Sequence, residues 1–191
     1  MGRVSNVLMN DENDIKMAGG LLMMMNGSPF VYYGEEIGMA SKGSKDENKR
    51  TAMLWSSDST AAGMTKGPAD ADKDINSAFD AVDKQLKDEN SILNYYKRAL
   101  RLRNENPEIA RGEITLIDSL CQGYQAAITK SYNGSTIGIV YNTSDEVIIV
   151  DISGTEISDM KIRGYLTLNN EEITLKDGML TMPAQSICIL K

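Results

Sequence analysis

Hydrophobic residues repeat along this chain with two different periods, and the change falls near Gly112. Before it, apolar residues recur at helical spacing over residues 13–25. Asn13 or Asp14 can cap the start of this helix, and Asn26-Gly27 supplies its stop. The first part of the chain is therefore predicted to be helical around this segment.

A second and stronger helical stripe begins at Asp88 or Asn90 and ends at Asn106-Pro107, because the residue before a proline disfavours the helical conformation. Just ahead of it, residues 82–86 are predicted to form a helical turn. The long stretch 40–80, rich in Gly, Ser, Asp and Lys, has no clear period and is predicted to be an irregular loop.

After Gly112 the period becomes alternating, which is typical of half-buried strands. Turn signals such as Asn133-Gly134 and Asp177-Gly178 separate the alternating segments. Several short strands at this spacing predict an antiparallel sandwich with Greek-key connections. The predicted strands cover residues 113–120, 124–132, 136–142, 147–152, 161–168, 172–175 and 187–190.

One short segment between the two helices has a different pattern. Residues 30–33 are aromatic or β-branched and lie between Pro29 and Gly34, so they are predicted to form one buried strand. Two carboxylates, Glu35 and Glu36, follow at once. A buried strand that ends in a glycine turn with carboxylates is typical of a parallel α/β sheet or barrel, whose chemistry lies at the carboxyl ends of the strands.

This segment carries a resemblance to a known family. The run from Gly27-Ser28-Pro29 to Tyr32-Tyr33-Gly34-Glu35-Glu36-Ile37-Gly38-Met39 resembles the last strand of the catalytic barrel in α-amylase family glycoside hydrolases. Residues 91–107 also resemble that family's last barrel helix. The resemblance implies an α+β chain, with the last strand and flanking helices of a (β/α)8 barrel in residues 1–112 and the antiparallel Greek-key β-sandwich in residues 113–191.

The resemblance also implies a sugar-binding site. Residues 46–55 resemble the family segment in which an Asp and an Arg four positions later hydrogen-bond the sugar at the inner end of the cleft, here Asp46 and Arg50. Met1-Gly2-Arg3 resembles the end of the family's Asn-His-Asp-x-x-Arg motif, which adds Arg3 to the predicted site. Without the resemblance, Asp46 and Arg50 are equally compatible with a solvated ion pair. Trp55 is predicted to be buried under the loop, with sugar stacking as the alternative.

No catalytic residue is predicted in this chain. The resemblance implies three catalytic carboxylates that would all precede Met1 in sequence. Glu35 and Glu36 are adjacent, so in an extended segment they point to opposite sides and do not form the facing pair that a retaining glycosidase needs. The chain contains no histidine, which excludes a Ser-His-Asp arrangement. The isolated chain is therefore predicted to be inactive.

The composition of the chain restricts the partners and cofactors that it is predicted to bind. The 20 Lys and Arg residues against 27 Asp and Glu give a net charge of -7, so neither nucleic acid nor a membrane is a predicted partner. Residues 70–76 imitate the start of a calcium loop but lack its later glycine and glutamate, so no metal site or cofactor is predicted, although calcium remains possible in an intact enzyme. Cys121 and Cys188 are predicted to be unpaired thiols. No signal peptide is predicted, and both a secreted and a cytoplasmic location stay open.

The sequence therefore predicts the C-terminal portion of an α-amylase-type enzyme that acts on α-linked glucans such as starch, malto-oligosaccharides or related α-glucosides. The alternative is a non-catalytic carbohydrate-binding or interaction module. A single barrel strand with unpaired edges would leave apolar surface uncovered, so residues 1–110 are also predicted to dimerise or to be partly disordered.

Overall fold

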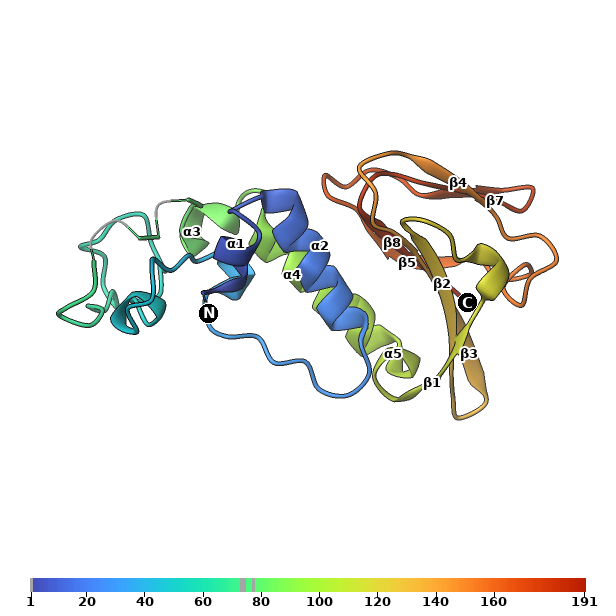
Figure 1. Cartoon of the computed structure of the whole chain (residues 1–191), viewed down its shortest axis with the longest axis horizontal. Coiled ribbons are helices and arrows are strands. Elements are labelled where there is room, and N and C mark those ends of the chain that lie inside the picture. The colour runs from blue at the N-terminus through green and yellow to red at the C-terminus, as the bar shows by residue number, and fades with distance from the viewer. Residues whose placement is uncertain (1, 73–74, 77) are drawn as a thin grey trace. The chain divides into compact units, whose positions relative to one another are not determined.

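A computed structural model describes residues 2–72, 75–76 and 78–191 and divides into two compact units (Figure 1). The first unit comprises Met1–Gly19 and Phe30–Lys97, and the second comprises Gly20–Pro29 and Arg98–Lys191. The predicted division into domains at residue 112 stays a prediction, because compact units need not coincide with domains.

The first unit is built from short helices and irregular segments. Helix α2 begins one residue before the predicted caps, because the Asp11 carboxylate accepts hydrogen bonds from the backbone N–H groups of Asn13 and Asp14 at 2.9 and 3.0 Å. The predicted caps at Asn13 or Asp14 are thus wrong. The elements are α1 (Val4–Val7), the start of α2 (Glu12–Met24), the 3-10 helices η1 (Glu35–Ile37) and η2 (Glu47–Lys49), α3 (Val82–Gln85) and the start of α4 (Ile92–Glu105).

Helix α4 follows the predicted stripe but begins later than Asp88 or Asn90. The Ser91 hydroxyl accepts the backbone N–H of Asn94 at 3.3 Å, which makes Ser91 the cap. The helix ends at Glu105, before Asn106-Pro107, as predicted. The sequence pattern missed α5 (Pro107–Arg111), in which Pro107 occupies the first turn, where a missing N–H costs nothing.

The predicted strand over residues 30–33 does not form. These residues belong to no helix or strand of the described chain, and Phe30 is 89% exposed while Val31, Tyr32 and Tyr33 are also exposed. The prediction of a buried strand is wrong for this structure because the described residues provide no neighbouring strand to pair with its N–H and C=O groups. Whether a second copy of the chain pairs with it stays a prediction.

The second unit contains the strands. They form a five-stranded antiparallel sheet in the order β1-β2-β3-β8-β5 and a three-stranded antiparallel sheet in the order β4-β7-β6 (Figure 1). Since β3 neighbours β8, the chain crosses between the sheets, and the predicted sandwich is confirmed. The strands are β1 (Glu113–Leu116), β2 (Gln125–Tyr132), β3 (Ser135–Asn142), β4 (Ile148–Asp151), β5 (Ile162–Leu166), β6 (Thr174–Lys176), β7 (Met179–Met182) and β8 (Ser186–Leu190).

A single apolar core fills the space between the two sheets. Val140 and Leu190 from the larger sheet meet Val150 and Leu180 from the smaller one, and all are at most 2% exposed. Strand β7, which the sequence pattern missed, supplies Leu180 and Met182 to this core. Met179 is apolar although it is exposed, so Met179, Leu180 and Met182 give no alternating pattern, and the pairing with β4 and β6 reveals the strand.

The end of helix α2 is closed by two buried cations from distant parts of the second unit. Arg103 of α4 donates hydrogen bonds to the backbone oxygens of Met23 and Met25, both at 2.6 Å, and of Gly27. Lys130 of β2 donates to the backbone oxygens of Met24 and Ile109 and to the Asn26 side chain. These contacts satisfy the carbonyls that a helix leaves unpaired at its C-terminus. Arg103, Lys130 and Asn26 are called the cap cluster below.

The two cysteines form no disulfide, as predicted: Cys188 is buried and Cys121 is partly buried. Burial raises the pKa of the Cys188 thiol to about 12. Within the described residues, no helix is long and apolar enough to cross a bilayer.

Candidate functional site

The three residues predicted to bind sugar lie together in the first unit. Arg3, Asp46 and Arg50 line one open cavity of about 310 Å³. The cavity is completed by four residues that the sequence analysis did not assign to the site, Gly2, Tyr32, Glu35 and Lys49. Tyr32 and Glu35 lie within the motif that carried the family resemblance, and Lys49 precedes Arg50, so their positions in sequence were the available signal.

Arg3 is the most buried charged group of this cavity, with an exposed fraction of 4%. Its Nη1 donates to the Tyr33 backbone oxygen at 2.5 Å and its Nε to the Lys49 backbone oxygen at 3.2 Å. The guanidinium also lies 4.8 and 4.7 Å from the ring centroids of Tyr32 and Tyr33. Arg3 therefore connects the N-terminus of α1 to the segments on both sides of the cavity.

Further bonds hold α1 in place behind Arg3. The backbone N–H of Arg3 donates to the Ser41 hydroxyl at 3.1 Å, and the Asn6 side chain accepts the Ser41 backbone N–H at 2.5 Å. The Ser5 hydroxyl donates to the Met39 backbone oxygen at 2.7 Å. These bonds bring together segments separated by more than 30 residues, so the cavity wall is set by tertiary structure.

Asp46 and Arg50 form an ion pair on the solvent side of the cavity. The Arg50 Nη2 atom lies 2.6 Å from the Asp46 Oδ2 atom, and the side chains are 55% and 65% exposed for Arg50 and Asp46 respectively. They flank helix η2, one at each end. The pair leaves a guanidinium and a carboxylate exposed at the cavity, and these groups can donate and accept hydrogen bonds.

The glutamates after the predicted strand are positioned by a tight glycine-flanked turn. Helix η1 lies between Gly34 and Gly38, which have φ values of 84° and 72°. A Cβ atom on Gly34 would lie 2.2 Å from the Met39 sulfur, so both its φ and its surroundings require glycine. Glu35 turns back so that its carboxylate accepts the Tyr32 backbone N–H at 3.1 Å.

Burial and these carboxylates also affect Tyr96 of α4. Burial of the phenol, with further contributions from Glu35 and Glu36, raises the pKa of Tyr96 to about 12. The phenol is therefore neutral near pH 7. One oxygen of Glu36 is buried with no hydrogen-bond partner among the described residues.

Trp55 is not buried, contrary to the prediction. It is 54% exposed, and residues 51–56 around it have no regular structure of their own. It is not among the residues that line the cavity with Arg3.

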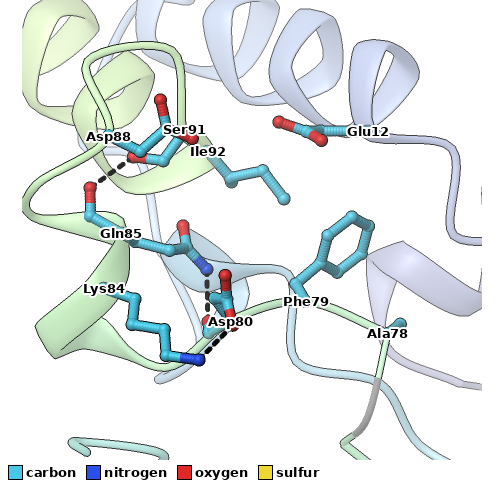
Figure 2. Close-up of a pocket in the computed structure, with 9 residues that line it drawn as sticks. All are labelled: Glu12, Ala78, Phe79, Asp80, Lys84, Gln85, Asp88, Ser91 and Ile92. Carbon is cyan, nitrogen blue, oxygen red and sulfur yellow. Dashed lines mark hydrogen bonds and ion pairs between the residues drawn. The ribbon is translucent and has the colours of Figure 1, made fainter. Parts of the chain in front are cut away.

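A second cavity of about 370 Å³ lies beside helices α3 and α4 (Figure 2). Most of its polar groups bond to one another: Lys84 pairs with Asp80 at 3.4 Å, the Gln85 side chain donates to the Asp80 backbone oxygen at 2.7 Å, and Ser91 donates to the Gln85 backbone oxygen at 2.7 Å. Figure 2 shows these groups as sticks around Phe79 and Ile92. The network fixes the connection between the two helices and leaves few groups for a ligand.

The segment that imitates a calcium loop is used differently here. Asp72 exchanges two hydrogen bonds with the Asn48 side chain, at 2.9 and 3.0 Å, and lies 3.6 Å from the Lys45 ammonium. The hydrogen bond from Asn48 lowers the pKa of Asp72 although the carboxylate is exposed. Asp74 of the same segment lies outside the described residues. Across the part of the chain that is described, no group of three acidic, cysteine or histidine residues is placed to hold a metal.

The family model for "Alpha amylase, catalytic domain" matches residues 1–112. This match covers more than half of the chain, so the chain belongs to the α-amylase family.

Individual relatives agree with this assignment. The chain is 35% identical over 176 residues to Alpha-amylase SusG from Bacteroides thetaiotaomicron, a match that covers 88% of this chain and 24% of SusG. It superposes on the structure titled Eubacterium rectale Amy13B with a TM-score of 0.92 at 37% identity, covering 100% of this chain and 37% of that one. An α-amylase structure from H. orenii gives a TM-score of 0.78 at 26% identity, covering 99% of this chain and 37% of that one.

The matches define which part of the family fold is present. The chain spans about a quarter of SusG and over a third of each of the two structures, and it has the fold of the C-terminal part of α-amylase family enzymes. The fold class predicted from the sequence is thereby confirmed, apart from the strand at residues 30–33.

Proposed function

We propose that this chain supplies one side of the sugar-binding cleft of an α-amylase-type glycoside hydrolase that acts on α-linked glucans. Asp46 and Arg50 hydrogen-bond the hydroxyl groups of a glucose unit, and Arg3 supports them from the inner end of the cavity. The observation that carries this proposal is the cavity itself, which gathers Arg3, Asp46 and Arg50 from positions up to 47 residues apart.

The names of the relatives support this substrate class. They include an α-amylase, a cyclomaltodextrinase from Thermoanaerobacter pseudethanolicus and an oligo-1,6-glucosidase from Halalkalibacterium halodurans. All three names point to an enzyme that acts on glucose oligomers or polymers, and one of them names a 1,6-linkage. Maltoheptaose is thus a suitable probe for the shared part of the site.

We also propose that the 191-residue chain by itself does not hydrolyse its ligand. Glu35 and Asp46 both line the cavity, but Glu35 is engaged by the Tyr32 backbone N–H and Asp46 by the Arg50 guanidinium. A glycosidase needs one carboxyl group that can donate a proton and a second that faces it across the scissile bond, whereas both carboxylates here are already engaged by protein donors. Binding and hydrolysis are therefore expected to be separable in this chain.

The test is a titration of the chain with maltoheptaose, followed by two-dimensional NMR, together with a reducing-sugar assay on the same sample. We expect shifts in the signals of residues 46–50 and no release of reducing ends. Asp46→Asn keeps the size of the side chain and removes its charge, so it is expected to weaken binding severalfold, whereas Asp88→Asn, far from this cavity in sequence, serves as the matched control. Binding that is unaffected by Asp46→Asn, or the absence of binding by the unmodified chain, would refute the proposed site. Release of reducing ends would refute the proposed inactivity.

A further inference from the structure

Tyr32 occupies a position in the cavity that its neighbours in sequence do not share. It lines the cavity together with Asp46 and Arg50 and is 46% exposed. Phe30, two residues earlier, is 89% exposed and is not among the residues that line the cavity. These two exposed aromatic residues thus have different surroundings, and of the two Tyr32 lines the cavity with the charged groups of the site.

The ring of Tyr32 is held from one side. The guanidinium of Arg3 lies over it, with Cζ 4.8 Å from the ring centroid. Arg3 is itself fixed, because it is buried and bonded to the backbone oxygens of Tyr33 and Lys49. The ring of Tyr33 stands 4.8 Å from that of Tyr32 at an interplanar angle of 54°, which adds a second support.

The backbone of Tyr32 is fixed as well. Its N–H donates to the Glu35 carboxylate at 3.1 Å, and its C=O accepts the Glu35 N–H at 3.0 Å. The left-handed turn at Gly34 makes this reciprocal pair of bonds possible. Both the backbone and one ring face are therefore constrained before any ligand binds, and a preorganised contact loses little conformational entropy on binding.

A glucose unit matches the groups of the cavity that remain exposed to solvent. Its ring carries C–H groups on its faces and hydroxyl groups around its rim, so it pairs an aromatic surface with charged or polar groups at the edge. The exposed part of the Tyr32 ring offers the first, and the Asp46 and Arg50 pair offers the second. We propose that Tyr32 is a further substrate-contacting residue, against whose exposed ring a glucose unit of the α-glucan rests. This inference rests on the proposed function of the same cavity.

The experiment compares four variants of the full chain by titration with maltoheptaose. Tyr32→Phe keeps the ring and is expected to bind within about twofold of the unmodified chain. Tyr32→Leu keeps apolar bulk but removes the aromatic face, and it is expected to bind about tenfold more weakly, as is Tyr32→Ala. Phe30→Ala removes the neighbouring exposed ring and is the matched control, with an expected change below twofold.

The outcomes separate this inference from the function it rests on. If the unmodified chain binds maltoheptaose and Tyr32→Leu binds equally well, the role of Tyr32 is refuted while the sugar site stands. If the unmodified chain does not bind, the proposed function itself fails. NMR signals of Ser41 and Lys49 report on the bonds that Arg3 makes, and we expect them to stay unchanged in Tyr32→Leu. If these signals shift strongly and Tyr32→Phe also loses binding, the loss comes from a change in the fold, and the proposed contact is refuted.

Discussion

The cap cluster in the second unit and the Asp46–Arg50 pair in the first both contain an arginine side chain, but the surroundings of the two arginines are opposite. In the cap cluster, Arg103 and Lys130 are buried and their donors are directed at backbone and amide oxygens. In the cavity, Arg50 is more than half exposed and pairs with the Asp46 carboxylate, which is also more than half exposed. The first arrangement replaces water by protein, whereas the second keeps its charges accessible to a ligand.

This difference predicts where stability and function reside. A buried donor that satisfies several carbonyls is expensive to remove, because each abandoned oxygen stays desolvated. An exposed ion pair contributes little to stability, because water and salt already screen its charges. Substitutions in the cap cluster should therefore affect unfolding, and substitutions in the cavity should affect binding.

The largest effect is expected for Arg103→Met. This change keeps the long apolar stem but leaves the backbone oxygens of Met23, Met25 and Gly27 without their donor. We expect the free energy of unfolding to fall by about 3 kcal/mol or more. Urea unfolding followed by circular dichroism measures this loss of stability. Faster hydrogen exchange over residues 24–28 would show that the loss originates at the end of α2. Arg101→Met, at an exposed position of the same helix, is the control and should cost less than about 0.5 kcal/mol.

A smaller effect is expected from the charge of Lys130. Burial, together with the nearby Arg103, lowers the pKa of the Lys130 ammonium from 10.5 to about 8. Between these two values the unfolded chain binds more protons than the folded one, so this residue makes the free energy of unfolding rise with pH across that window. This gain in the free energy of unfolding, of order 1 to 3 kcal/mol, is fully present above the pKa of Lys130 in the unfolded chain and absent below its pKa in the folded chain.

Other lysines and tyrosines also titrate in this range, so the contribution of Lys130 is isolated by difference. Lys130→Met should be less stable overall, because three oxygens lose a donor. The difference in the free energy of unfolding between the unmodified chain and Lys130→Met should grow as the pH rises from 8 to 10.5. Parallel pH profiles of the two proteins would contradict the lowered pKa.

The smallest effect is expected in the cavity. A double-mutant cycle of Asp46→Asn and Arg50→Gln should give a coupling energy of about 0.5 kcal/mol or less for unfolding, since both side chains are more than half exposed. The same cycle measured on maltoheptaose binding should give a larger coupling, because the proposed function has both groups hydrogen-bond the same glucose unit. A coupling in unfolding as large as that in binding would erase the distinction between the two regions.

The sequence predicted the periodic elements well and failed where tertiary contacts decide. Helix α4 and most strands have clear periods, so their existence and most of their boundaries followed from spacing alone. Strand β7 was missed because Met179 is apolar although it faces solvent, which removes the alternation. Helix α2 takes its cap from Asp11 instead of Asn13 or Asp14, a choice between nearby polar residues that spacing does not determine. Residues 30–33 have strand composition but find no strand beside them among the described residues, and composition does not report on partners.

For the site, the family resemblance placed Arg3, Asp46 and Arg50, and the structure brings all three to one cavity. It did not reveal that Arg3 is buried against two tyrosine rings, because that depends on how α1 meets a segment 30 residues later. Tyr32 was interpreted as part of a buried strand, so its exposure to the cavity was not foreseen.

The cap cluster also affects how the chain folds while the ribosome synthesises it. The backbone oxygen of Met24 is bonded by a lysine that lies 106 residues later in the chain. As a ribosome adds residues at roughly 5–20 per second, the C-terminal turn of α2 waits several seconds before its last donor is made. During that time the emerging helix ends in unpaired carbonyls beside exposed methionines. A chaperone that binds apolar nascent segments would therefore find its target at the end of α2, and would lose it once β2 has paired.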